Sequence, residues 1–168
     1  LPNAGHRALA EFASAYPDRL ALIPQNVDGL HQRAGSSDVL CLHGDIFVDR
    51  WLDMPCSCCH VQDAAAGSPP YCDRCGNLLR PGMVWFGEPL PFAALEADQN
   101  AARRCDVILV LVLGTAGAVY PAAGLAKHAR TAGAQVVVVN TAPSALDDTG
   151  HAVLRGEAGA VLSQVLDT

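Results

Sequence analysis

The sequence predicts an α/β fold built on a parallel sheet, with a small metal-binding insertion. Two nearly all-apolar runs, residues 105–114 and 134–140, flank a helical segment at 120–133, and this order is typical of a parallel βαβ unit. Residues 56–75 hold five of the seven cysteines of the chain, a clustering that favours a metal site. The length of 168 residues allows one domain with a full hydrophobic core and a small insertion.

The first part of the chain predicts a helix followed by two short strands. Residues 5–16 place apolar side chains on one side at helical spacing, and Pro17 ends the helix. Residues 20–23 (LALI) predict a short buried strand. Residues 38–44 (DVLCLHG) predict a second strand that runs into a turn at Gly44.

The second half of the chain supplies the βαβ unit and a closing helix. The apolar run at 105–114 ends in glycine and is typical of a strand buried on both faces of a parallel sheet. The helix at 120–133 has a proline in its first turn and a glycine at its end. A second buried strand follows at 134–140, and residues 160–167 (AVLSQVLD) predict the last helix.

Composition and charge exclude several classes of function. The chain has 11 Lys and Arg against 17 Asp and Glu, a net charge of -6, and no basic cluster, so we expect no direct nucleic-acid binding. The longest apolar run, residues 107–113, is too short to cross a membrane. Clustered cysteines favour a reducing, cytoplasmic location. The chain begins at Leu1 rather than Met, and we expect the start of the parent protein to be missing.

Four of the clustered cysteines have the spacing of a structural zinc site. Cys56 and Cys59 form one Cys-x-x-Cys pair, and Cys72 and Cys75 form another after twelve intervening residues. Four thiolates fill every position of tetrahedral zinc and leave none for water or substrate. Such a site is structural, although a set of reduced thiols or a redox pair is an alternative. Two neighbours are spare candidate ligands: Cys58 and His60.

A second group of polar residues follows the predicted N-terminal strands. Gln25, Asn26, Asp28, His31 and His43 lie in loops after these strands, which is where open α/β sheets bind their ligands. The carboxamides and the carboxylate suit an amide ligand, and a histidine at a strand end is a candidate general base. The alternatives are turn formers beside a glycine, a surface histidine and a hydrogen-bonded loop histidine.

Two further segments are candidates for binding. Residues 112–124 run from a strand through a Gly-rich turn into a helix, whose free amides could hold a phosphate, and Asn140 ends the next strand. Helix capping is the alternative role of this turn. Residues 78–91 contain Trp85 and Phe86, followed by Gly87 and Glu88. They form either a strand edge that pairs with a peptide or an aromatic cap on the core.

These segments, in this order, resemble the sirtuins, the NAD-dependent protein lysine deacylases. The run "QNVDGLHQRAG" (25–35) is similar to the family signature Q-N-[IV]-D-x-L-H-x-x-A-G, and "LHG" (42–44) to the segment with the catalytic histidine. The run "CDRCGNLLRPGMVWFGE" (72–88) is similar to the second zinc knuckle and the substrate-binding strand. The run "GTAGAVYPAAG" (114–124) is similar to the branch of bacterial and desuccinylase-type enzymes.

The resemblance implies the fold in more detail. It implies a Rossmann-like parallel sheet, incomplete at the N-terminus, with a small four-cysteine zinc-ribbon insertion. Residues 1–50 and 92–168 would form the partial NAD-binding domain. Residues 51–91 would form the zinc-binding module and the substrate-binding strand.

The resemblance also implies roles for individual residues. His43 would be the general base that acts on a ribose hydroxyl, after the acyl-lysine carbonyl oxygen has attacked the anomeric carbon of NAD. The implied products are nicotinamide, free lysine and an O-acyl-ADP-ribose. Asn26 and Asp28 would line the nicotinamide pocket, and Gln25 would contact the adjoining ribose. The other implied contacts are Gly114, Thr115 and Asn140 with the adenosine side, and Val84, Phe86, Gly87 and Glu88 with the substrate backbone.

Three departures from the family pattern bear on activity. The Gly-Ala-Gly-x-Ser loop and the Phe-Arg segment of the family would precede Leu1. Pro24 replaces the usual Thr and removes a backbone donor, and Ala116 replaces a Ser. We therefore expect these 168 residues alone to bind NAD weakly and to turn over slowly or not at all. A zinc-stabilised, non-catalytic peptide-binding remnant and a protein ADP-ribosyltransferase are the alternative functions.

Overall fold

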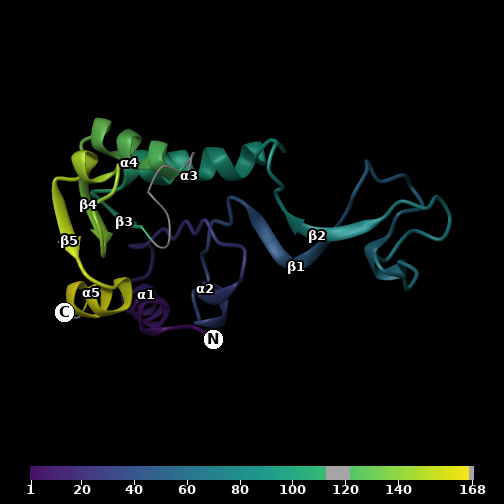
Figure 1. Ribbon diagram of the computed structural model, residues 1–168, viewed down its shortest axis with the longest axis horizontal. Helices are drawn as coiled ribbons and strands as arrows, with labels where there is room; N and C mark the ends of the chain where they lie inside the picture. Colours follow the sequence, from purple (N-terminus) through teal and green to yellow (C-terminus); the bar gives the residue numbers. More distant parts are fainter. Residues whose placement is uncertain (113–121, 167–168) are drawn as a thin grey trace. The chain divides into compact units, whose positions relative to one another are not determined.

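The computed structural model of the chain describes residues 1–112 and 122–166, which form two compact units (Figure 1). Three segments of the chain make up unit 1 and two make up unit 2. Unit 1 consists of Leu1–Gln25, Leu30–Leu42 and Pro91–Thr168, and unit 2 consists of Asn26–Gly29 and His43–Leu90.

Unit 1 is an α/β unit with a parallel sheet. The sheet order is β3-β4-β5, and both pairs of strands are parallel. This confirms the parallel pairing that the two apolar runs predict. The described elements of unit 1 are α1 (Ala4–Ala15), α2 (Leu30–Arg33), α3 (Phe92–Arg104), β3 (Val107–Leu111), α4 (Ala122–Thr131), β4 (Gln135–Asn140), the 3-10 turn Asp147–Thr149, β5 (Ala152–Arg155) and α5 (Ala158–Val165).

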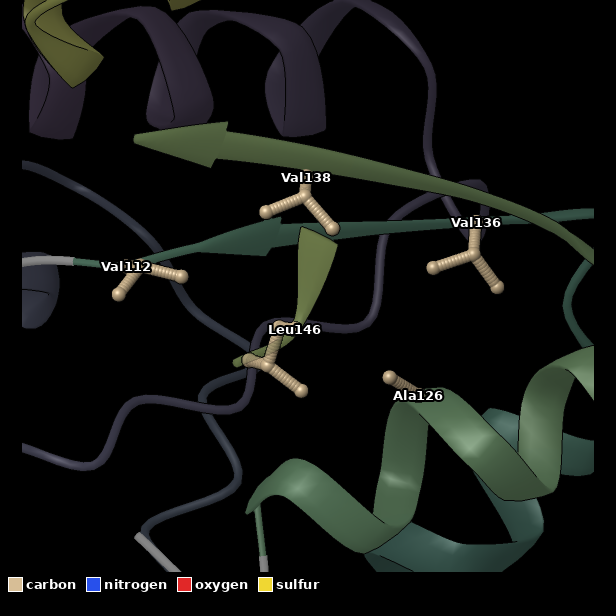
Figure 2. Close-up of a cluster of buried hydrophobic side chains, with 5 residues drawn as sticks. All are labelled: Val112, Ala126, Val136, Val138 and Leu146. Carbon is tan, nitrogen blue, oxygen red and sulfur yellow. The ribbon is translucent and has the colours of Figure 1, made fainter. Parts of the chain in front are cut away.

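The sheet buries aliphatic side chains against α4. Figure 2 shows five of them pointing toward one another: Val112, Ala126, Val136, Val138 and Leu146. The three side chains of Ala126, Val136 and Val138 are completely buried. Branched side chains pack well on a pleated surface, and each fully buried Val or Leu contributes about 1.5–3 kcal/mol to folding.

Small residues bring the helices of unit 1 close together. Ala102 of α3 and Ala129 of α4 are both fully or almost fully buried in a second core cluster. At the packing of α1 on α5, a Cβ on Gly5 would lie 3.3 Å from both Gly159 Cα and Leu162 Cδ1. A Cβ at Gly5 would therefore require its neighbours on α5 to shift by a few tenths of an ångström.

One buried side chain in α3 is polar. Asp98 is fully buried, and neither of its carboxylate oxygens has a hydrogen-bond partner among the described residues. It lies one helical turn before Ala102 and so on the same face of α3. Burial raises the pKa of Asp98 to about 6, because an ionised carboxylate is disfavoured in an apolar environment.

Unit 2 is held by a two-stranded antiparallel sheet. Its described elements are β1 (Gly44–Trp51), the 3-10 turn Val61–Asp63 and β2 (Leu79–Met83).

The register of this sheet is interrupted once. Asp45 pairs with Gly82 and Asp49 pairs with Pro81, so residues 46–48 bulge out of β1. A bulge of this kind bends the strand and re-aims its side chains.

The two predicted N-terminal strands do not form. Leu22 and Val39 make one isolated parallel bridge in place of a ladder. The amide of Leu42 bonds to the carbonyl of Leu40 at 3.0 Å, a local turn that ends any extended run, and Pro24 lacks a backbone donor. The helix predicted at 5–16 is confirmed as α1, and the strand at 134–140 as β4.

The sequence predicts that no apolar segment is long enough to cross a membrane, and the lengths of the helices can be compared with this prediction. Within residues 1–112 and 122–166, none of the helices has the length and apolar character that crossing a bilayer requires.

Candidate functional site

His43 lies at the start of the β1–β2 sheet, where the backbone fixes its position. The amide of Val84 donates to the carbonyl of His43 at 2.9 Å. The next residue, Gly44, has φ +80, and a Cβ there would lie 2.2 Å from the carbonyl oxygen of Gly82. Only glycine fits at this crossing of two strands. The pKa of His43 is lowered by burial, which keeps its ring neutral and able to accept a proton near pH 7.

The segment Asn26–Gly29 belongs to the same unit as His43. The amide of Ile46, in the bulge of β1, donates to the carbonyl of Val27 at 3.1 Å. Gly29 has φ +62, and a Cβ there would lie 3.5 Å from the ring of Phe47. The bulge of β1 therefore holds this segment, which carries Asn26 and Asp28.

The predicted substrate-binding residues continue the chain beyond β2. The strand ends at Met83, and the bond from Val84 to His43 is the last rung of the sheet. Trp85 is 45% exposed and Phe86 is fully exposed. The full exposure of Phe86 argues against the alternative that both aromatic side chains cap the core.

Sequence reasoning missed a charged cluster in unit 2. The carboxylate of Glu88 accepts hydrogen bonds from Arg50 at 2.8 and 2.9 Å, from Arg80, and from the backbone amide of Trp85 at 2.8 Å. The side chain of Arg80 is only 5% exposed. An arginine in an otherwise apolar strand is a signal of such a partner, because a buried guanidinium needs one.

Five cysteine sulfurs converge in unit 2. The sulfurs of Cys56, Cys59 and Cys75 form a triangle with sides of 3.4, 3.5 and 3.5 Å. Cys58 lies 2.7 Å from Cys56, and Cys72 lies 3.9 Å from Cys58. The sulfurs of Cys56, Cys58, Cys59 and Cys75 all lie within 4.8 Å of one another. In the part of the chain that the structure describes, neither the predicted ligand Cys72 nor a histidine joins this group.

The geometry of this cluster fits zinc. In a regular zinc tetrathiolate with Zn–S bonds of about 2.3 Å, the sulfurs stand about 3.8 Å apart. The triangle of Cys56, Cys59 and Cys75 is close to that spacing, whereas Cys58 is too close to Cys56 for both to occupy corners. The hydrogen bond between those two sulfurs lowers the pKa of Cys56 to about 6 and raises that of Cys58. Cys56 therefore favours the thiolate, which is the form that binds metal, whereas burial raises the pKa of Cys59 to about 11.

Tight turns present the cysteines as two knuckles. The amide of Cys59 donates to the carbonyl of Cys56 at 2.9 Å, and the amide of Gly76 donates to the carbonyl of Cys72 at 2.8 Å. Gly76 has φ +75, a conformation that suits glycine. The two Cys-x-x-Cys pairs of the sequence therefore fold into the paired turns typical of a zinc ribbon.

Two of the residues predicted to bind the cofactor belong to unit 1: Asn140, expected on the adenosine side, and Gln25, expected at the nicotinamide-side ribose. Asn140 ends β4 and is 9% exposed, and its side-chain oxygen accepts a hydrogen bond from the amide of Ala142 at 3.4 Å. Gln25 is half-buried at the end of the first segment of unit 1. Gly114 and Thr115 lie outside the described residues.

A parallel α/β unit, together with a two-knuckle cysteine module and a neutral histidine at a strand end, defines a Rossmann-like fold with a metal-binding insertion. The model of the Sir2 family matches residues 1–121 of the chain. The chain belongs to the Sir2 family.

Named relatives agree with this membership. The chain is 51% identical over 165 residues to an NAD-dependent protein deacylase of Ralstonia nicotianae, and 45% identical over 167 residues to NAD-dependent protein deacylase 2 of Pyrobaculum aerophilum. These matches cover 98% and 99% of the chain. The chain spans about 65% of the length of either relative.

Solved structures of the family have the same fold. A Sir2 homolog–NAD complex matches with a TM-score of 0.84 at 39% identity, over 99% of this chain and 64% of that one. Sir2 bound to acetylated peptide matches with a TM-score of 0.83 at 32% identity, over 99% of this chain and 70% of that one.

Proposed function

We propose that the chain is part of an NAD-dependent protein lysine deacylase that releases nicotinamide and O-acyl-ADP-ribose. The observation that carries the proposal is the hydrogen bond between Val84 and His43. It joins the backbone of the candidate base to the segment that would bind the substrate. The names of the relatives and the acetylated peptide bound by one structural neighbour support the same activity.

The proposed cofactor is NAD. When bound, NAD supplies the ribose that receives the acyl group. Gln25, Asn26 and Asp28 would hold its nicotinamide side, and Gly114, Thr115 and Asn140 its adenosine side. The carboxamide of Asn140, almost fully buried at the carboxyl end of β4, is a donor and acceptor of the kind that suits a ribose.

His43 would act as the general base. A ring that burial keeps neutral can take a proton from a hydroxyl near pH 7. The backbone of Val84, Phe86, Gly87 and Glu88 would pair with the peptide on either side of the acyl-lysine. This pairing leaves the acyl group to be recognised elsewhere.

The proposed metal is a structural zinc held by Cys56, Cys59, Cys72 and Cys75. The triangle of three sulfurs, and the knuckle that presents Cys72, support this set. Four thiolates leave no open position, so zinc would stabilise the module that carries Val84–Glu88 and take no part in the chemistry.

Residues 51–91 would form this module, with residues 1–50 and 92–168 as the cofactor domain. A metal-thiolate site also supports a cytoplasmic location.

The activity is tested with an acetyl- or succinyl-lysine peptide, NAD and the purified chain, with products followed by mass spectrometry. We expect O-acyl-ADP-ribose and nicotinamide to form slowly, and His43→Ala to abolish both while zinc content stays the same. Product formation by His43→Ala, or by the wild type without NAD, would contradict the proposal. The two alternatives, a peptide-binding remnant and an ADP-ribosyltransferase, gain no support from relatives that are named deacylases.

A further inference from the structure

Packing does little to hold the segment Val84–Glu88 in place. Trp85 is 45% exposed and Phe86 is fully exposed. Gly87 has φ +88, and a Cβ there would meet nothing within 4 Å. A segment with so few neighbours would sample many conformations unless polar contacts fixed it.

Glu88 closes this segment into a loop. Its amide donates to the carbonyl of Trp85 at 3.0 Å, and its carboxylate accepts from the amide of Trp85 at 2.8 Å. The bond from Trp85, followed by that from Arg80, lowers the pKa of Glu88. The carboxylate is therefore ionised at neutral pH and works as a fixed acceptor.

Arg80 connects this loop to β2. Its guanidinium donates to the carboxylate of Glu88 and, at 2.9 Å, to the carbonyl of Met83. The same group stacks on the ring of Trp85, 4.0 Å from its centroid. One side chain thus contacts the last residue of the strand, the aromatic ring of the loop and the acid that closes it.

Arg50 supports the cluster from the other strand. Arg50 and Arg80 stand opposite each other in the β1–β2 pairing, and like charges in this position repel. The carboxylate of Glu88 lies between them and pairs with both. The side chain of Arg50 is 41% exposed, against 5% for Arg80, so water screens the contribution of Arg50 more strongly.

We propose that Arg80 is a positioning residue for the substrate: through Glu88 and Trp85 it holds Val84–Glu88 in the conformation that receives the acyl-lysine peptide. This role rests on the proposed function. A loop that is ordered before binding loses less entropy when the peptide binds. Because Val84 also bonds to His43, the same contacts keep the peptide segment in register with the candidate base.

Lysine cannot replace arginine in this role. The planar guanidinium of Arg80 donates in two directions while its face covers a ring. A lysine ammonium is a point charge that offers no such planar stack. Arg80→Lys is therefore a sharp test, because it keeps the positive charge and removes the planar guanidinium that donates in two directions and stacks on Trp85.

The test measures binding of an acetyl-lysine peptide to the zinc-loaded chain by calorimetry. We expect Arg80→Met and Glu88→Gln to raise the dissociation constant about tenfold or more, the usual size of a lost hydrogen bond to a charged group. Arg80→Lys should restore little of the affinity, and Arg50→Met should have a smaller effect. The control is Arg104→Met, at an exposed arginine of α3, which should bind like the wild type.

A second measurement separates positioning from folding. In a Trp51→Phe background, Trp85 is the one remaining tryptophan, and its emission should change in Arg80→Met because the stacked guanidinium is gone. Zinc content should stay the same, although the melting temperature should fall because the ion pair of Arg80 with Glu88 also stabilises unit 2. Wild-type affinity in both Arg80→Met and Glu88→Gln would overturn the positioning role alone. A wild-type chain that binds no acetyl-lysine peptide would overturn the proposed function, and this role with it.

Discussion

The two units of this chain are stabilised by different means. Unit 1 buries aliphatic side chains around its parallel sheet, including Val136, Val138 and Leu162, each almost fully buried. Among the residues of unit 2, all of which the structure describes, Cys72 and Leu79 are the buried hydrophobic side chains. Unit 2 relies instead on a cysteine cluster and on the ion pairs of Glu88.

This difference shows how a small unit compensates for a small core. Burial of apolar surface scales with size, so a short segment cannot offset the entropy of folding by packing alone. A metal bound by four thiolates supplies about 10–16 kcal/mol in small zinc modules. The two units should therefore respond to different perturbations.

The largest effect should come from loss of the metal. Cys75→Ser removes one corner of the sulfur triangle, and we expect loss of zinc and unfolding of unit 2, at a cost of about 10 kcal/mol or more. Both tryptophans, Trp51 and Trp85, belong to unit 2. Tryptophan emission therefore reports on this unit, and zinc is counted by elemental analysis.

The matched control is the spare thiol. Cys58→Ser should keep one zinc per chain, because Cys58 stands too close to Cys56 to occupy a second corner. Cys72→Ser should release zinc like Cys75→Ser. Loss of zinc in Cys58→Ser, with zinc retained in Cys72→Ser, would assign the fourth ligand to Cys58.

An intermediate effect is expected from the hydrophobic core of unit 1. Leu162→Ala deletes a side chain that is 1% exposed, and we expect a loss of about 2–5 kcal/mol. Helical circular dichroism should melt earlier, while zinc content and tryptophan emission at low temperature stay the same. Val165→Ala, 48% exposed on the same helix, should cost far less. Equal losses in the two variants would argue against the packing of α5 described above.

The smallest effect concerns Asp98. Its folded pKa of about 6 lies above the ordinary value of 3.8, so the folded state binds a proton more tightly than the unfolded state. Ionisation of Asp98 therefore lowers the free energy of unfolding as pH rises from about 4 to above 6. The loss is on the order of 2–3 kcal/mol when Asp98 is fully ionised.

Asp98→Asn should remove this dependence. In urea unfolding, the wild type should lose on the order of 1 kcal/mol relative to the variant between pH 5 and pH 8. Comparison with the variant cancels the contributions of other groups, such as Glu88. A constant difference between the two proteins across this range would mean that Asp98 is not protonated in the folded state.

Local patterns in the sequence predicted a large share of this structure. The apolar run of β4 and the helical spacing of apolar residues in α1 are patterns within one element. Such patterns can therefore be recognised without knowing which distant residues the element contacts. The paired Cys-x-x-Cys spacing likewise encodes two knuckles. A short motif likewise marks His43 as the candidate base.

Longer-range features escaped prediction. The pairing of β1 with β2 joins residues that are 28 (Trp51 and Leu79) to 39 (Gly44 and Met83) positions apart, and a bulge shifts its register. The strands predicted near Leu22 and Val39 reduced to a single bridge, since a strand needs a partner as well as a pattern.

The sequence by itself determined the class of fold, the two cysteine knuckles and the candidate base, because each is written in residues close together along the chain. The tertiary structure alone decided that Arg50, Arg80 and Glu88 meet, and that Asp98 is buried with no hydrogen-bond partner among residues 1–112 and 122–166. The physical reason is that charge pairing and burial depend on which distant segments share a surface, and hydrophobic periodicity carries no such information.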